Sequence, residues 1–294
     1  MFKIGMDLGG TKIEGIVLDE EDNELFRKRV PTEQEQGYKH IVSNISHLYR
    51  DLIAELNGAD FTFGIGTPGA ISLKTGLLKN SNTICMNGKP LKADLERAIM
   101  RPIAIQNDAN CFALAEAIKG AGQGKDMVFG VIIGTGCGGG LIHGGKIHTG
   151  LQAIGGEWGH MSIDPNGPLC YCGAHGCVEC YISGGGLTKR WTEQYGEDRP
   201  LIEVEKNYYS GEPQAVDFMN VFFENFGRAM ANLIHILDPD IIVLGGGLSK
   251  FKAIYTEAIK EVERHIFSDS LETPIVQHQL GDSAGVIGAA LMGI

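Results

Sequence analysis

One short stretch of the chain contains four side chains of the kinds that bind zinc. His160, Cys170, Cys172 and Cys177 fall within eighteen residues, with Gly and Pro residues between them. Thiolate and imidazole groups suit Zn²⁺, and four of them complete a closed tetrahedral site. The intervening loop has too few apolar residues to hold its own shape, so a metal crosslink would supply the missing rigidity. The alternative is a cysteine-bearing loop without a metal, but the convergence of four ligands favours zinc.

A carboxylate, Asp108, is the second candidate for chemistry. It follows an expected strand at 102–106 and begins an expected helix that extends to about residue 119. A carboxylate in this place stands in the crevice where α/β folds bind ligands. Asp and Asn are also favoured at helix N-caps, so an ordinary cap explains Asn107 and Asp108 equally well on local grounds.

Glycine-rich turns could bring backbone N–H groups against an anion at two places. The first turn, 9–12, joins expected strands at 2–7 and 13–19, and Asp7 at the end of the first strand could hold a hydrated Mg²⁺. It matches neither a P-loop nor a Rossmann fingerprint, and a simple hairpin is the alternative. The second turn, 134–140, repeats this strand–turn–strand layout about 125 residues later. The repeat suggests duplicated halves that face a shared nucleotide.

The remaining elements alternate between strands and helices, which indicates an α/β protein. A third glycine cluster ends an expected strand at 240–249, and the segment 193–213 is polar and acidic. Cys137, inside the second turn, is interpreted as a packing residue because no His neighbours it there. The other expected helices lie at 37–56, about 91–100, 214–236, 251–265 and 285–291, and the other strands at 61–66, 128–133, 141–147 and 274–278.

Composition and charge exclude several classes of protein. With 294 residues and a net charge of −11, the chain lacks the clustered cations of a nucleic-acid surface. No apolar run approaches the roughly 20 residues of a membrane span, and the N-terminus does not resemble a signal peptide. Seven Cys residues, three of them in the zinc stretch, fit a reducing compartment better than a disulfide framework. We therefore expect a cytoplasmic protein that binds small molecules rather than nucleic acid or a membrane.

Seven short motifs occur in one order: DLGGTK at 7–12, TPG at 67–69, NDAN at 107–110, GTGCGGG at 134–140, GGEWGH at 155–160, CYCGAHGCVE at 170–179 and VLGGG at 243–247. Together they resemble the ROK family of bacterial sugar kinases and repressors over essentially the whole chain. The resemblance implies an α/β, two-domain actin/hexokinase/Hsp70-like (ribonuclease H-like) ATPase fold with an inserted zinc-binding loop. We expect residues 1–117, completed by the C-terminal helix 285–294, as one domain. Residues 118–284, with the zinc knuckle 160–177, would form the other.

The resemblance also implies a role for each candidate residue. Asp108 falls on the position of the family's general base, which takes the proton of a sugar hydroxyl as the γ-phosphoryl group of ATP transfers. Mg²⁺ accompanies ATP, and the zinc is structural because protein fills all four positions. One nitrogen of His160 would bind zinc, which orients the other toward the sugar. His175 matches no ligand position. The positions that match sugar-binding residues are Gly69, Asn82, Asn107, Asp108, Glu157, His160 and Glu179. Those that match ATP-binding residues are Asp7, Gly9, Gly10, Thr11, Lys12, Gly134, Thr135, Gly136, Cys137, Gly138, Gly245, Gly246 and Gly247.

Finer sequence details favour one sugar over another. The segment KNSNTICMNGKPLKADL (79–95) looks most like the manno(fructo)kinase branch, so a fructokinase that phosphorylates the 6-hydroxyl of fructose, and possibly of mannose, is the first expectation. The N-acetyl-D-glucosamine kinase branch is the alternative, since it shares the zinc ligands, NDANCFAL at 107–114 and a GDSAG-like ending at 281–285. An N-acetyl group would need an extra pocket beside the sugar C2.

Two other classes of protein fit the sequence less well. A ROK repressor would carry a helix-turn-helix segment roughly 60–80 residues long ahead of DLGGT, whereas the first expected strand begins at residue 2. A non-kinase ATPase of the same fold would have no reason to keep the sugar-binding residues in order. Family members are often dimers, so a homodimer is a further expectation that the resemblance carries.

Overall fold

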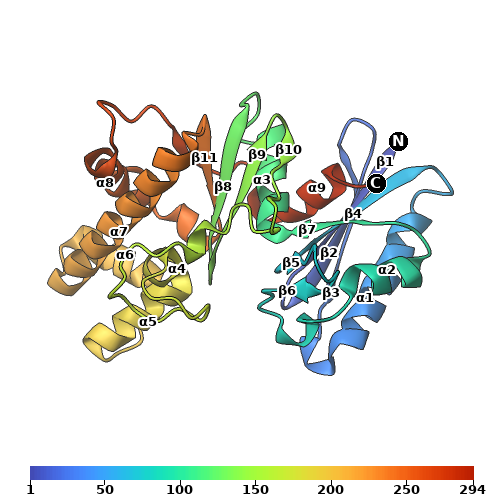
Figure 1. The fold of residues 1–294 in the computed structure, drawn as a ribbon, viewed down its shortest axis with the longest axis horizontal. Coiled ribbons are helices and arrows are strands. Elements are labelled where there is room, and N and C mark those ends of the chain that lie inside the picture. Colours follow the sequence, from blue (N-terminus) through green and yellow to red (C-terminus); the bar gives the residue numbers. More distant parts are fainter.

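The computed structural model describes residues 1–294 and contains two five-stranded sheets built on one plan (Figure 1). The first sheet has the order β3-β2-β1-β4-β7 and the second the order β10-β9-β8-β11-β12. In each sheet the three strands that come first in the sequence pair in antiparallel fashion, β1 with β2 and β2 with β3, and likewise β8 with β9 and β9 with β10. The two later strands run parallel on the other side, β4 and β7 beside β1, and β11 and β12 beside β8. The strands are β1 Phe2–Leu8, β2 Lys12–Leu18, β3 Glu24–Pro31, β4 Phe61–Thr67, β7 Ala104–Asn107, β8 Met127–Ile133, β9 Cys137–His143, β10 Lys146–Ile147, β11 Ile241–Gly245 and β12 Ile275–Gln277. The shared strand order confirms that the two halves have the same topology.

Two helices lie between the sheets and join the halves. Helix α3, Asp108–Lys119, packs on β8 and β9, and helix α9, Ala284–Leu291, packs on β1 and β4 (Figure 1). The helices cross so closely that a Cβ on Gly288 would lie 1.8 Å from the carbonyl oxygen of Cys111. A Cβ on Gly5 of β1 would likewise lie 2.3 Å from the carbonyl oxygen of Val286. Glycine at these two positions therefore permits the chain's last helix to return to the first sheet.

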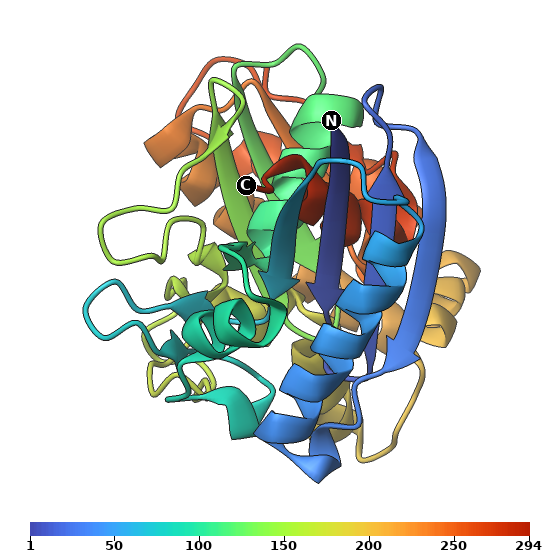
Figure 2. The same cartoon turned by 90° about the vertical axis from the view of Figure 1, so that its right-hand side faces the viewer.

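The outer faces of the sheets are covered by the other helices. Helix α1, Tyr38–Ala54, covers the face of the first sheet opposite α9 (Figure 2). Helix α7, Pro213–Leu237, runs through the largest apolar core, where Trp191, Phe222 and Phe226 are fully buried. No helix is both long and apolar enough to cross a bilayer. The remaining elements are α2 Leu91–Ile99, α4 Val178–Ile182, α5 Gly184–Tyr195, α6 Leu201–Ser210, α8 Glu257–His265 and the small hairpin of β5 Ala70–Ile71 and β6 Leu78–Lys79.

The structure differs from the expected secondary structure in four details. The second glycine turn is only three residues long, because Cys137–Gly140 already belong to β9 and pair with β8. The expected helix at 251–265 is divided into a 3-10 turn, Lys252–Tyr255, and α8. The polar segment 193–213, for which no helix was expected, contains α6 and the ends of two neighbouring helices. Strand β3 was missed, because it is an edge strand whose residues are mostly charged and exposed.

Candidate active site

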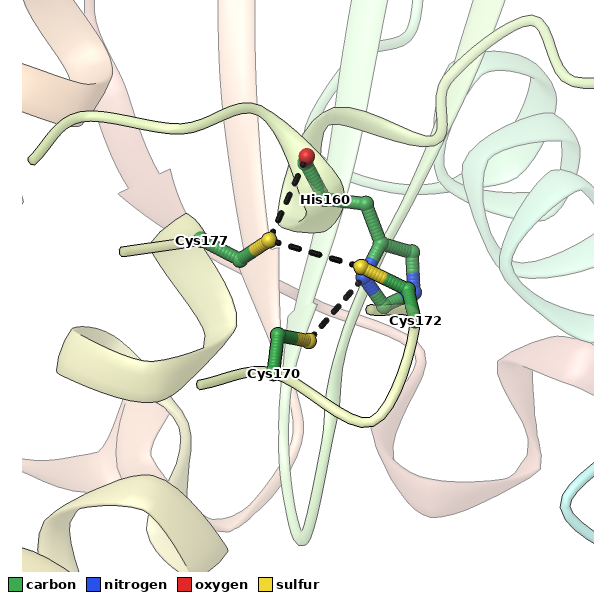
Figure 3. Close-up of side chains that lie close together, drawn as sticks. All are labelled: His160, Cys170, Cys172 and Cys177. Atoms are coloured by element: carbon green, nitrogen blue, oxygen red, sulfur yellow. Dashed lines mark hydrogen bonds between the residues drawn. The ribbon is translucent and has the colours of Figure 1, made fainter. Parts of the chain in front are cut away.

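The four candidate metal ligands converge at one point (Figure 3). His160 ends a 3-10 turn that follows β10, Cys170 and Cys172 lie on the next loop, and Cys177 directly precedes α4. One ligand atom from each lies within 4.8 Å of the others. The Sγ atoms of Cys172 and Cys177 are 3.6 Å apart, and Cys170 Sγ is 3.7 Å from Nδ1 of His160.

These distances fit a zinc ion. Two thiolates on one tetrahedral Zn²⁺, each about 2.3 Å from the metal, lie about 3.8 Å apart. The same distances are far longer than a disulfide bond of about 2.05 Å, and all seven cysteines are free. His175 lies outside the cluster, because its Nδ1 donates to the carbonyl oxygen of Gly167 at 2.9 Å. The donor set is therefore one imidazole and three sulfur atoms.

Asp108 is the first residue of α3, directly after β7, and Asn107 is the helix cap. The side-chain oxygen of Asn107 accepts the backbone N–H of Ala109 at 2.9 Å, as an N-cap does. Oδ1 of Asp108 accepts the same N–H at 2.8 Å. Burial raises the pKa of Asp108 to about 6, and the negative charge of Glu157 contributes to the rise. The cap thus explains Asn107, and it leaves Asp108 with an unusually basic carboxylate at the start of the helix.

All seven residues expected to bind the sugar line one cavity of about 280 Å³. Asn107 Nδ2 donates to the carbonyl oxygen of Gly69 at 3.1 Å, which ties the end of β7 to the turn after β4. Oε2 of Glu179 accepts the backbone N–H of Cys137 at 2.8 Å, which ties α4 to the start of β9. Residues 134–138 of the second glycine turn line the same cavity. Side chains and turn therefore meet, although they come from segments far apart in the sequence.

The glycine clusters expected at the nucleotide lie in different places. Gly134 and Thr135 also line an open cavity of about 800 Å³, together with Gly247 and the α5 residues Gly184 and Gly185. The other two glycines of the third cluster have packing reasons instead. A Cβ at position 245 would meet the Phe112 ring at 2.5 Å, and position 246 has a φ of 82°. The first turn, Gly9–Lys12, lines neither cavity.

Burial raises the pKa values of two side chains near these turns, Asp7 and Cys137. Burial raises the pKa of Asp7 to about 7, and the charges of Asp108 and Glu14 add to the rise. Oδ1 of Asp7 is buried and has no hydrogen-bond partner in the protein. Burial also raises the pKa of the Cys137 thiol well above its usual range, which favours a packing role over a reactive thiolate.

Sequence reasoning missed a second, smaller cavity that adjoins the first. It has a volume of about 180 Å³ and shares Asn107 and Glu157 with the larger one. Its polar wall is a chain of amides: Gln106 Nε2 donates to Thr149 Oγ1 at 2.8 Å, and Gln106 Oε1 accepts from Asn110 Nδ2 at 3.1 Å. Its apolar wall consists of Ala70, Ile71, Leu73, Ile105 and Ala153. No local pattern could have revealed it, because its walls come from five separate stretches of the chain, 67–73, 92, 105–110, 139 and 149–157.

Within the polar wall, one oxygen atom lacks a partner. The backbone N–H of Asn107 donates to Gln106 Oε1 at 3.3 Å, so the atom of Gln106 that faces it must be the oxygen. The atom of Asn110 that faces the same oxygen must then be its nitrogen. Asn110 is only 6% exposed, and its Oδ1 is buried without a hydrogen bond. Asn110 lines the smaller cavity, while its unpaired Oδ1 is itself closed off from solvent.

The ROK family profile matches residues 3–293. The chain belongs to the ROK family. An N-acetyl-D-glucosamine kinase of Vibrio parahaemolyticus is 39% identical over 300 residues, which cover 99% of this ROK chain and 99% of that protein. The crystal structure of a ROK hexokinase from Thermus thermophilus has a TM-score of 0.89 at 33% identity and covers 100% of this chain and 98% of that chain. A ROK glucokinase from Streptomyces griseus, solved with glucose and AMPPNP, has a TM-score of 0.80 at 30% identity, with 100% and 99% covered.

These comparisons confirm the family and the two-domain actin/hexokinase-like fold. They do not support the manno(fructo)kinase branch as the nearest one. The Vibrio relative, which spans the whole ROK chain, has the activity that was the alternative. The relatives therefore favour the alternative branch over the one that the segment 79–95 suggested.

Proposed function

We propose that this ROK protein is an ATP-dependent kinase that phosphorylates the 6-hydroxyl of N-acetyl-D-glucosamine. The observation that carries the proposal is the single cavity that joins Asp108, the polar side chains around it and the glycine turn 134–136. A sugar hydroxyl is a poor nucleophile, so its attack on phosphorus needs a base within hydrogen-bond reach. Phosphoryl transfer otherwise depends on positioning and on charge stabilisation.

In this proposal Asp108 accepts the proton of the attacking hydroxyl. With a pKa of about 6, Asp108 is mostly ionised at neutral pH and is a stronger base than an ordinary aspartate. The backbone N–H groups of the glycine turn are placed to receive phosphate oxygens. Mg²⁺ bound with ATP would neutralise charge on those oxygens.

The other polar residues of the cavity would hold the sugar ring. Carboxylates such as Glu157 and Glu179 accept from hydroxyls, and the amides of Asn82 and Asn107 can both donate and accept. The backbone contact of Glu179 fixes one of its oxygens and leaves the other for the sugar. Zinc at the cysteine cluster would hold Nδ1 of His160, so that Nε2 carries the proton and donates.

The smaller cavity supports N-acetyl-D-glucosamine rather than fructose. An acetamido group needs a small apolar wall for its methyl group and an acceptor for its N–H. The cavity offers an apolar wall in the side chains around Ala70, and Glu157, which lines both cavities, is a carboxylate that can accept the N–H. The Vibrio kinase of the same length supports the same sugar. A fructose ring, which has no acetamido group, would leave this cavity empty.

The proposal is tested by filling the smaller cavity. Ala70→Leu places three more carbons in a space of about 180 Å³. The leucine and the acetamido group would then compete for the same space, and overpacking of this kind costs about 1–3 kcal/mol. We expect kcat/KM for N-acetyl-D-glucosamine to fall by about tenfold or more, while glucose, which lacks the acetamido group, is affected much less. Equal losses with the two sugars would place the acetamido group elsewhere. ADP release that does not depend on any hexose would contradict the kinase itself.

A further inference from the structure

Tyr171 lies between two of the metal ligands, Cys170 and Cys172, and its side chain turns back over His160. The Tyr171 hydroxyl is 3.0 Å from Nε2 of His160. The two rings meet edge to face, with centroids 5.1 Å apart and planes at 87°. The Tyr171 side chain is 78% exposed, so burial does not hold it in place. This contact with His160 is its one side-chain hydrogen bond.

His160 has only two polar ring atoms, and each already faces a group of the zinc loop. Nδ1 faces Cys170 Sγ within the ligand cluster, and Nε2 faces the Tyr171 hydroxyl. Nε2 is the atom left to donate to a sugar, and one N–H cannot make two full hydrogen bonds in different directions. Tyr171 also lines the sugar cavity beside Glu157 and Glu179. A sugar that binds His160 must therefore replace the tyrosine hydroxyl.

We infer that Tyr171 is a positioning residue that covers Nε2 of His160 in the sugar-free protein and moves away when the sugar binds. This inference rests on the proposed function, because it assigns Nε2 to the sugar. In the empty site the tyrosine hydroxyl occupies Nε2, and the sugar must break this contact before it can bind. The ring can rotate without disturbing the core because it is largely exposed, and zinc bound by Cys170 and Cys172 would hold the backbone on both sides of it. The consequence is a weaker apparent affinity for any sugar.

The test is Tyr171→Phe, which removes the hydroxyl and keeps the ring. A hydrogen bond of this kind contributes about 0.5–1.5 kcal/mol, so the Kd for sugar measured by calorimetry without ATP should fall by about twofold to tenfold. KM should fall by the same factor, kcat should stay within about twofold, and zinc content should not change. The effect should be equal for N-acetyl-D-glucosamine and glucose, because Nε2 does not read the acetamido group. Tyr209→Phe, at an exposed tyrosine of α6 without side-chain hydrogen bonds, is the matched control and should change nothing.

The opposite results are equally clear. A Kd that rises in Tyr171→Phe would show that the hydroxyl contacts the sugar directly, and an unchanged Kd would show that it does not compete with the sugar. Either outcome overturns the inference while the kinase proposal stands. Tyr171→Leu provides a second variant that lacks both hydroxyl and ring, and it should also tighten binding. If the unaltered protein binds and phosphorylates no hexose, the proposed function fails and the inference fails with it.

Discussion

Protonation of Asp108 should limit the activity of this protein below neutral pH. Burial, together with the nearby charge of Glu157, raises its pKa from 3.8 to about 6. A general base acts only when it is ionised. With a pKa of about 6, about 99% of Asp108 is ionised at pH 8 and about a tenth at pH 5. An aspartate with the ordinary pKa would still be more than nine-tenths ionised at pH 5. We therefore expect kcat/KM to be about tenfold lower at pH 5 than at pH 8.

The assay is the initial rate of sugar phosphate formation between pH 5 and 9, measured directly rather than through coupling enzymes. Low pH also protonates zinc ligands, so zinc content is measured at each pH and activity is checked after return to pH 8. Asp108→Asn should lower kcat by about 10²–10⁴ and abolish the acid limb, while sugar binding persists. Glu157→Gln should move the limb to lower pH, because it removes a charge that raises the pKa of Asp108. A zinc-replete protein with constant kcat/KM from pH 8 to 5 would refute the assignment of Asp108 as the base.

Two further substitutions test the parts of the site that surround this base. Cys172→Ser removes one of the four candidate ligands, so the protein should lose zinc. Its KM for sugar should then rise, because Nδ1 of His160 is no longer held. A zinc-free variant with a normal KM would show that the metal site does not affect sugar binding. Asp7→Asn removes a buried carboxyl whose pKa is raised from 3.8 to about 7. This carboxyl lowers the stability of the fold progressively as the pH rises from about 4 to about 7, and its full penalty is present above pH 7. At pH 8 the Tm of Asp7→Asn should therefore exceed that of the unaltered protein by about 2 °C or more, and at pH 5 by much less. An equal Tm at pH 8 would contradict the burial of this charge.

The cluster of candidate metal ligands was predictable from sequence because all four residues lie close together in the chain. Ligand chemistry and short spacing are both visible in the stretch from His160 to Cys177, and the structure needs only a single loop to bring the atoms together. The role of Asp108 was predictable only in part. Its position between a strand and a helix suggested a binding or catalytic site, but it suggested a helix N-cap equally well. The fold separated the two roles, giving the cap to Asn107 and the raised pKa to Asp108.

Other features could not be read from sequence because they depend on tertiary packing. The glycines after Cys137 look like a loop, but they belong to a strand that lies against α3, where a Cβ on Gly140 would meet the carbonyl oxygen of Ala109 at 2.7 Å. Tyr171 gave no signal beyond its place between two cysteines. Sequence alone also gave no sound basis for choosing the sugar, for a related reason. The residues around the smaller cavity come from β4, β5, α2, β7, α3, β9 and the loop after β10, and no single motif contains them.

One measurement tests the central claim most directly: initial rates of ATP-dependent phosphorylation with N-acetyl-D-glucosamine, glucose, mannose and fructose at equal concentration. The cavity of about 180 Å³, with its apolar wall and the Glu157 carboxylate, predicts the highest kcat/KM for N-acetyl-D-glucosamine, with ADP release only when sugar is present. A higher kcat/KM for fructose or mannose would contradict the assignment of that cavity to an acetamido group.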